Sequence, residues 1–493
     1  MEKEISNQLT IIGAGIAGLS AGIYAQKRGF QCTIYEQHYL PGGNCTSWKR
    51  KGYLFEGGLH WLTGSRKDLP LYKEWVYLGA ISPSTIIHNR EAFISCIYDQ
   101  QIISFYTNPE RLRDHLLEIS PVDEKAIRKL YKQIRRFSGI VMPIFDVPGV
   151  KLKERTSKLY LWKMLFTVLR LSPFGKISAK EYAKSFKHPA IRLMLEEVAG
   201  AENKASHMLT LLASVCSGDG GYPEGGSTEM AKRMATYFEK LGGKIYYSSN
   251  VEKIHLEQNK VCSITVNGKS VTASQLIVTN DTREAIDTLF ETPLNEPWCQ
   301  KMRQDTKPVI CTFVSVGLKK DWSYLPSNFL IPLTESLSFG DFSYKSLFLN
   351  NYASYPIYAP SGCTALTCIL FGDSYDYWKK AKDDGSYSEK KETLAERFAH
   401  VLTTHFQLSR DEIEIIDIAT PLTFERYCGT YHGSWMTIDQ VGKKAAIYPI
   451  KPETISNLYF AGQRIMSPGG TPVALLTGRQ AVQYLCKDNN IPF

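Results

Sequence analysis

The first 36 residues alternate between apolar runs and polar breaks in a way that predicts a strand, a turn, a helix and a second strand. An apolar run from Gln8 to Ile12 predicts the first strand, and residues 17–28 predict the helix. Another apolar run, from Cys32 to Tyr35, predicts the second strand. Elements in this order form a βαβ unit, in which the two strands lie parallel.

The turn between the first strand and the helix contains three glycines. Gly13, Gly15 and Gly18 have the spacing G-x-G-x-x-G. The first permits a tight turn, the second lets the backbone approach a pyrophosphate, and the third lets the helix pack closely on the strand. The helix N-terminus attracts phosphate, and Glu36 after the second strand can accept hydrogen bonds from a ribose. We therefore predict a dinucleotide site at which NADP is disfavoured, while NAD and FAD remain open.

Later glycines favour FAD. Residues 41–43 read Pro-Gly-Gly, residues 57 and 58 are a second glycine pair, and Gly469-Gly470 precedes a helix predicted from Val473 to Leu485. An extended FAD needs close backbone contact over this length. The nicotinamide arm of NAD is instead bound by the second mononucleotide-binding half of the fold. The second helix N-terminus can also stabilise negative charge on a reduced flavin. Ordinary surface turns at 41–43 and 57–58 are the alternative interpretation.

The middle of the chain changes period several times. Apolar residues recur with helical spacing from Pro109 to about Ile140, which predicts a helical insertion that forms a wall or lid over a site. The other elements predicted here are strands at 93–98, 102–106, 309–316 and 364–371, and a charged, exposed helix at 389–406.

A helix predicted at 159–171 has a narrow polar stripe. Lys163, Thr167 and Arg170 fall at positions i, i+4 and i+7, while the other faces are apolar. Basic residues flank this helix between 151 and 180. Such a helix can lie in the plane of a membrane with its charges reaching the headgroups. A helix that is buried on most sides in a large domain fits the same pattern, so both interpretations stand.

A glycine-rich turn at 216–229 predicts that the chain returns to the first sheet. It opens a helix that ends near Gly242, and a strand, a hairpin around Asn267-Gly268 and a last strand to Asn280 follow. We predict an α/β (α+β) fold with a discontinuous, Rossmann-like FAD-binding domain. That domain comprises residues 1–75, 215–290 and 415–493, and the inserted substrate domain comprises a mixed sheet and helices at 76–214 and 291–414, with its helical insertion at 109–200.

Composition and charge add limited information. The net charge of +9 over 493 residues is mild and is compatible with an anionic membrane surface. Nucleic acid is not an expected partner, because there is no zinc-finger spacing or basic tract. Eleven cysteines without a C-x-x-C pair favour reduced thiols in a cytosolic protein, and no apolar stretch is long enough for a signal peptide or a transmembrane span. We expect a cytoplasmic protein, with peripheral contact at the inner face of the membrane through 151–180 left open.

The motifs together resemble the bacterial-type carotenoid (phytoene) desaturases, which are FAD-dependent, and their relatives the carotenoid isomerases and retinol saturases. All belong to the amine-oxidase-like flavoproteins. The resemblance is carried by residues 13–36, 41–43, 55–58, 221–226 and 458–478. Gly58-Leu-His60-Trp61 looks more like the retinol saturase segment, and Asn44 stands where desaturases commonly have arginine, which leaves one phosphate or flavin contact open.

The resemblance implies an FAD-dependent oxidoreductase that desaturates, saturates or isomerises carbon–carbon bonds of an apolar isoprenoid or polyene. His60 is our candidate for a group that moves a proton near the flavin, and a hydrogen-bonded structural histidine is the alternative. Arg426 and Tyr427 either line the substrate side or serve as packing and rim. The residues expected to bind FAD are Gly13, Gly15, Ile16, Ala17, Gly18, Glu36, Gly42, Gly43, Asn44, Val251, Gly462, Gly470 and Val473.

Two other functions remain. A flavin amine oxidase would have a polar pocket caged by aromatic rings in place of an apolar tunnel. A non-enzymatic prenyl-lipid carrier of the same fold would lack a working FAD site. The expected partners are an apolar small-molecule substrate and an electron donor or acceptor, for which a quinone, oxygen and nicotinamide are all open.

Overall fold

A five-stranded parallel sheet brings the two ends of the chain together. The computed structural model describes residues 7–150, 169–438 and 441–493. The strand order is β21-β13-β1-β2-β9, and every neighbouring pair is parallel. The strands are β1 (Gln8–Ile12), β2 (Gln31–Tyr35), β9 (Lys244–Tyr246), β13 (Leu276–Val278) and β21 (Leu458–Phe460). The predicted return of the chain to the first sheet is confirmed.

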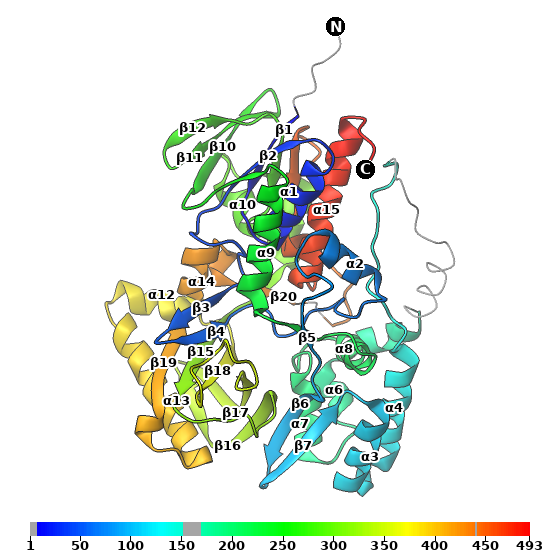
Figure 1. Cartoon of the computed structure of the whole chain (residues 1–493), viewed down its shortest axis with the longest axis vertical. Helices are drawn as coiled ribbons and strands as arrows, with labels where there is room; N and C mark the ends of the chain where they lie inside the picture. The colour runs from blue at the N-terminus through cyan, green and yellow to red at the C-terminus, as the bar shows by residue number, and fades with distance from the viewer. Residues whose placement is uncertain (1–6, 151–168, 439–440) are drawn as a thin grey trace.

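Helices cover this sheet, because a parallel sheet must bury both faces. The helix α1 (Ile16–Gln26) contacts both α9 (Gly226–Lys240) and α15 (Gly470–Asp488). In Figure 1 the blue α1 lies beside the red α15, although they begin about as far apart in sequence as the chain allows. The helix α15 begins at Gly470, three residues before the predicted Val473, since Pro472 is tolerated in a first helical turn.

A small antiparallel sheet follows α9 and β9. It consists of β10 (Val251–Glu257), β11 (Lys260–Val266) and β12 (Lys269–Thr272) in sequential order. The turn between β11 and β12 has positive φ at both Asn267 and Gly268, which is the geometry of a tight hairpin turn. The hairpin predicted there is confirmed.

A seven-stranded mixed sheet forms the second large layer, in the lower half of Figure 1. Its order is β19-β15-β18-β17-β16-β6-β7, and only the β16–β6 pair is parallel. The strands predicted in this region are confirmed. Their bounds are β6 (Ala92–Tyr98), β7 (Gln101–Tyr106), β15 (Cys311–Leu318), β16 (Asn328–Phe339), β17 (Phe342–Asn351), β18 (Thr364–Phe371) and β19 (Ile413–Ala419).

Two groups of helices pack on this sheet. One group is α12 (Tyr375–Asp383) and α13 (Tyr387–Phe406). The other forms its own core and consists of α3 (Pro109–Ile119), α4 (Glu124–Phe137), α6 (Ala179–Ala183), α7 (Pro189–Glu197) and α8 (Ala205–Cys216). The predicted helical insertion is therefore present from residue 109. The charged helix predicted at 389–406 is confirmed as α13, but only one face of it is exposed, because Leu394, Phe398 and Leu402 recur at helical spacing and are buried in the core against the sheet.

The remaining elements are short. The helices are α2 (Pro70–Tyr77), α10 (Thr282–Thr288), α11 (Pro297–Asp305) and α14 (Pro421–Cys428), and the two-stranded pairs are β3 (Ser47–Arg50) with β4 (Tyr53–Glu56), β5 (Ile87–His88) with β8 (Tyr222–Pro223), and β14 (Lys307–Val309) with β20 (Met436–Ile438). All eleven cysteines are free thiols. The domain limits given above stay a prediction.

The helix predicted at 159–171 lies outside the described residues except for its last three positions. Across residues 7–150, 169–438 and 441–493, no helix combines the length and the apolar character that crossing a bilayer requires.

Candidate functional site

The turn after β1 has the geometry that its glycines predict. Gly13 has φ +94°, and its N–H donates to the carbonyl of Tyr35 over 2.8 Å. A Cβ on Gly18 would lie 1.9 Å from the carbonyl oxygen of Gly13, so no larger residue fits there. The helix α1 begins without a capping side chain and without an acid in its first turn. Its first N–H groups are thus available to a phosphate. Ile16 and Ala17 in that turn are buried.

Glu36 lies at the carboxyl end of β2, beside this turn. Its carboxylate accepts hydrogen bonds from the backbone N–H of Ala14 over 2.6 Å and of His38 over 2.9 Å. The side chain is buried, and burial raises the pKa of Glu36 against the opposing effect of these two hydrogen bonds. The N–H of Ser249 donates to the backbone carbonyl of Glu36, which brings the start of β10 at Val251 close to the acid.

The glycines of residues 42 and 43 lie against the opening turn. Gly42 has φ +126°, donates its N–H to the carbonyl of Ala14 over 2.9 Å and forms a parallel bridge with Gly15. Asn44 follows, and its amide nitrogen donates to the carbonyls of Ser434 and Trp435. The Oδ1 atom of Asn44 is buried, and no described residue forms a hydrogen bond with it. A bound group with a donor at this place would satisfy that oxygen.

Thr279 lies between the opening turn and the C-terminal segment and contacts both. The hydroxyl of Thr279 donates to the carbonyls of Ile12 and Gly13 at 2.7 and 3.1 Å. The backbone carbonyl oxygen of Thr279 lies 3.5 Å from the position that a Cβ on Gly462 would take. Gly470 opens α15 with φ +84°, and Val473 in the first turn of that helix is buried. The structure therefore brings the predicted residues at the two ends of the chain to one place.

These features fit FAD. The buried Glu36 carboxylate beside Val251 suits the adenosine ribose, and the free N–H groups of α1 suit the pyrophosphate. The unpartnered oxygen of Asn44 and the N-terminus of α15 suit the flavin end. The individual FAD contacts remain predictions.

His60 follows β4 in a bend, with its ring against Trp435 at a centroid distance of 5.6 Å. Both ring nitrogens are buried and have no hydrogen-bond partner among the residues that the structure describes. Burial, and secondly the nearby Arg90 guanidinium, lowers the pKa of His60 to about 4. The ring is therefore neutral at neutral pH, with a lone pair on one of its two nitrogens. The alternative, a histidine held by hydrogen bonds of its ring, does not match these unpartnered nitrogens.

Trp435 was not identified from the sequence, although it occupies a central place. Its indole N–H donates to the carbonyl of Gly57 over 3.0 Å, and its ring contacts those of Phe313 and Phe371. Its own carbonyl accepts from Asn44 and from Gln463. No local pattern marks this tryptophan, since its partners come from distant parts of the chain.

Glu56 is a second residue whose role the sequence did not reveal. Its carboxylate is fully buried and accepts hydrogen bonds from the N–H groups of Gly58, Leu59 and Ser227. The hydroxyl of Tyr222 donates to the same carboxylate over 2.7 Å. Glu56 thereby joins the two glycine-rich segments at 55–58 and 221–226. The only sign of this role in the sequence is that an acid occurs in the first segment.

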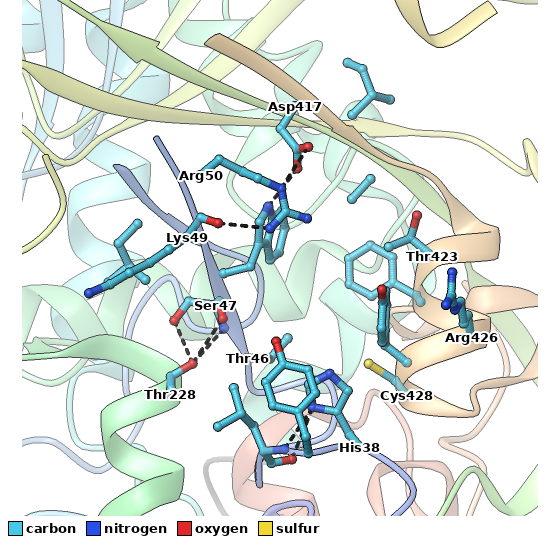
Figure 2. A pocket seen from close by; sticks show the side chains of 18 of the residues that line it. His38, Thr46, Ser47, Lys49, Arg50, Thr228, Asp417, Thr423, Arg426 and Cys428 are labelled. Carbon is cyan, nitrogen blue, oxygen red and sulfur yellow. Dashed lines mark hydrogen bonds and ion pairs between the residues drawn. The ribbon is translucent and has the colours of Figure 1, made fainter. Parts of the chain in front are cut away.

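A cavity of about 1150 Å³ lies to the side of this site (Figure 2). Its walls come from β3 and α9 on one side and from β19 and α14 on the other. None of the residues expected to bind FAD lines it, and neither does His60. Arg426 and Tyr427, for which a position on the substrate side was one expectation, line this cavity.

Comparison with known proteins agrees with this geometry. The family profile described as flavin containing amine oxidoreductase matches residues 16–486. The chain is 24% identical to the all-trans-retinol 13,14-reductase of Danio rerio, over 93% of this chain and 82% of that protein. It is 22% identical to the 1-hydroxycarotenoid 3,4-desaturase of a Flavobacterium species, over 97% and 99% of the two chains. The solved cyclohexylamine oxidase of Brevibacterium oxydans superposes with a TM-score of 0.60 at 13% identity, over 98% and 99%.

Proposed function

Because this chain belongs to the flavin-containing amine oxidoreductase family, it is an FAD-dependent oxidoreductase, and we propose that its substrate is an apolar isoprenoid or polyene. The reaction is the desaturation, saturation or isomerisation of a carbon–carbon bond. When bound, the flavin exchanges a hydride equivalent with a substrate carbon.

The relatives support this substrate class. Those that span nearly the whole chain are named as a retinol reductase, prolycopene isomerases and carotenoid desaturases, each at 20–24% identity. All of these names refer to conjugated polyenes, although the named reactions run in different directions. The direction for this chain depends on its electron partner, for which a quinone, oxygen and nicotinamide remain candidates.

The observation that carries the proposal is the neutral His60 against the ring of Trp435, which in turn contacts the ring of Phe313. Aromatic surfaces bind flat apolar molecules, and a neutral imidazole adds no charge that such a molecule would have to desolvate. The free ring nitrogen of His60 can accept or return a proton at the substrate carbon next to the one that exchanges hydride.

Arg90 argues against an amine substrate. Its guanidinium donates to the carbonyl of His60 over 2.9 Å and is the charged group that lowers the pKa of that histidine. A cation at this place repels an ammonium ion, which an amine oxidase must bind. The prenyl-lipid carrier is disfavoured by the intact glycine turn and the buried Glu36, which a protein without FAD would not need.

We further propose that the protein is cytoplasmic and contacts the inner face of the membrane through residues 151–180. The support is the sequence of this segment, with its apolar helix pattern and flanking basic residues. An apolar substrate resides in the bilayer, so contact there would shorten its path to the site. Binding to anionic vesicles, compared with a chain whose flanking lysines are replaced by glutamine, tests this proposal.

The substrate class is tested by anaerobic reoxidation of the flavin. The purified protein should be yellow, and the reduced holoprotein is mixed with retinoids, carotenoids, unsaturated prenols and, separately, imines. Recovery of the flavin absorbance with a polyene, together with a saturated product, supports the proposal, and so does an isomerised product that forms while the flavin stays reduced. The oxidised holoprotein is mixed with the corresponding saturated compounds to detect the opposite direction. Reaction with imines or amines alone would identify an amine oxidase instead.

A further inference from the structure

The cavity of Figure 2 separates the loop after β2 and strand β3 from helix α14 and lies beside the predicted FAD site. We name it the basic groove. Figure 2 shows Lys49 and Arg50 on β3 and Arg426 on α14, at opposite sides of the view, with Arg50 directed toward Asp417. Its volume of about 1150 Å³ slightly exceeds the range of about 300–1,000 Å³ that is usual for small-molecule sites.

The charge in the basic groove is strongly positive. The seven basic side chains that line it are Lys49, Arg50, Lys232, Arg233, Lys382, Lys391 and Arg426, whereas the three acidic ones are Glu224, Glu229 and Asp417. Arg50 pairs with Asp417 at 3.5 Å, and Lys232 pairs with Glu229 at 2.8 Å. Within the described part of the chain, Lys49, Lys382, Lys391 and Arg426 have no acidic partner. A cleft lined by unpaired cations concentrates anions.

Exposed rings and an aliphatic side chain accompany these cations. Tyr39 is 67% exposed, Tyr427 is 41% exposed and Ile357 is 48% exposed, and all three line the basic groove. The ring of His38 lies 4.3 Å from that of Tyr39 and 5.3 Å from that of Tyr427, so these side chains form one aromatic surface. Exposed rings of this size stack on flat or unsaturated groups.

The two features together define a ligand. We propose that the basic groove binds a diphosphate ester with a flat or unsaturated body, in which Lys49 and Arg426 contact the diphosphate and Tyr427 contacts the body. A nucleotide and a prenyl diphosphate share this chemistry. A bare membrane surface would not use a groove with aromatic rings inside it, and a polypeptide would not need this density of unpaired cations.

The basic groove shares a wall with the flavin site. The thiol of Cys428, which lines the groove, donates to the carbonyl of Gly43 over 3.6 Å. Gly43 lies against the opening turn of the predicted FAD site, where a Cβ on it would be 3.5 Å from the Cα of Gly15. A ligand that moves α14 would therefore change the surroundings of the flavin, and binding can be followed by the flavin absorbance and fluorescence as well as by calorimetry.

The test uses the FAD-saturated holoprotein, because an empty FAD site would itself accept a nucleotide. ADP, geranyl diphosphate and inorganic pyrophosphate are titrated separately, and flavin content is measured before and after. We expect saturable binding of at least one ester, tighter than that of pyrophosphate, and weakening as salt is raised. Preference for ADP identifies a nucleotide as the source, and preference for geranyl diphosphate identifies a prenyl lipid.

Three variants make the test specific. Replacing both Lys49→Gln and Arg426→Gln should weaken ester binding about tenfold for each cation removed. The double variant Lys125→Gln with Lys129→Gln makes the same charge change at exposed positions of α4, outside the groove, and should leave affinity unchanged. Tyr427→Ala should weaken ester binding about fivefold or more while sparing pyrophosphate.

Several outcomes would overturn the inference. They are no saturable binding of either ester, pyrophosphate binding as tightly as both esters, or an equal loss of affinity in the α4 control. Loss of affinity in the groove variants together with loss of flavin would also overturn it, because the ligand would then be occupying the FAD site.

Discussion

Arg464 and Asp281 form an ion pair at 2.9 Å in which each side chain is only 2% exposed. Asp281 follows β13 and also accepts the N–H groups of Arg283 and Tyr431. Arg464 follows β21 and also donates to the carbonyl of Met436 and the hydroxyl of Thr437. The pair thereby fixes the segment that contains Trp435 against the strands that carry the glycine turns.

Removing one member of this pair should destabilise the protein strongly. Arg464→Leu leaves the Asp281 carboxylate buried without its partner, which costs about 3–5 kcal/mol of unfolding free energy. The double variant Asp281→Asn with Arg464→Gln removes both charges and should recover part of this loss. Denaturant unfolding of the holoprotein, followed by tryptophan and flavin fluorescence, measures both changes.

The exposed pair of Arg410 and Glu396 serves as the control, with side chains 56% and 66% exposed. Arg410→Leu should cost less than about 1 kcal/mol. An Arg464→Leu variant no less stable than this control would refute the structural role assigned to the buried pair.

Glu36→Ala should weaken FAD binding. The substitution removes the acceptor for the N–H of Ala14 as well as the expected ribose contact. Hydrogen bonds to a charged group contribute about 1.5–3 kcal/mol, so the affinity for FAD should fall about tenfold or more. The affinity for FAD is measured by flavin release during dialysis and by titration of the apoprotein with FAD. Glu252→Ala is the matched control, because Glu252 is exposed and lies next to Val251 in β10. Equal FAD occupancy in the Glu36→Ala and Glu252→Ala variants would contradict the ribose contact.

The opening βαβ unit was predictable from the sequence because its determinants are local. The glycine spacing and Glu36 lie within about two dozen residues, and each has a geometric reason that does not depend on the rest of the fold. The hairpin at Asn267-Gly268 was predictable for the same reason. The helix at 389–406 is also predictable, but its buried face is not identified, because the many charges mask Leu394, Phe398 and Leu402 at helical spacing.

The parts that could not be predicted join residues far apart in the chain. Arg464 and Asp281 are 183 positions apart, and nothing near either residue indicates that they pair. The basic groove takes its lining from β3, α9, β19 and α14, among other segments, so it has no linear signature. Asn44 was read as a departure from a family pattern, whereas the structure shows it donating to the carbonyl of Trp435.

His60 should make the stability of the protein depend on pH between 6.5 and 4. Its pKa is about 4 in the folded chain and about 6.5 in the unfolded chain. In this window the unfolded chain binds the additional proton, so the unfolding free energy falls as pH falls, by about 3 kcal/mol in total. The stability that the neutral His60 ring contributes is therefore fully present above pH 6.5 and is lost as pH falls toward 4.

The pH effect is isolated by comparison with His60→Gln. The difference in unfolding free energy between wild type and this variant should change by about 3 kcal/mol across the window, since carboxylates titrate alike in both proteins. His400→Gln, at an exposed position of α13, is the matched variant and should show a smaller change. A flat difference curve for His60→Gln would show that the ring is not buried in its neutral form.

Gly478→Ala should disturb the packing of α15 against α1, the helices near the two ends of the chain. A Cβ at this position of α15 would lie 2.4 Å from the carbonyl oxygen of Ala17 and 3.1 Å from the backbone nitrogen of Ala21 in α1. Alanine has the better helix propensity by about 1 kcal/mol, but overpacking against backbone costs about 1–3 kcal/mol and also shifts α1, whose N-terminus faces the pyrophosphate. We therefore expect lower thermal stability and a reduced flavin content. Gly139→Ala, at an exposed position with no atom within 4 Å of the added Cβ, should change unfolding free energy by no more than about 0.5 kcal/mol. If Gly478→Ala retains full flavin and gains stability, α1 and α15 do not pack as closely as the structure shows.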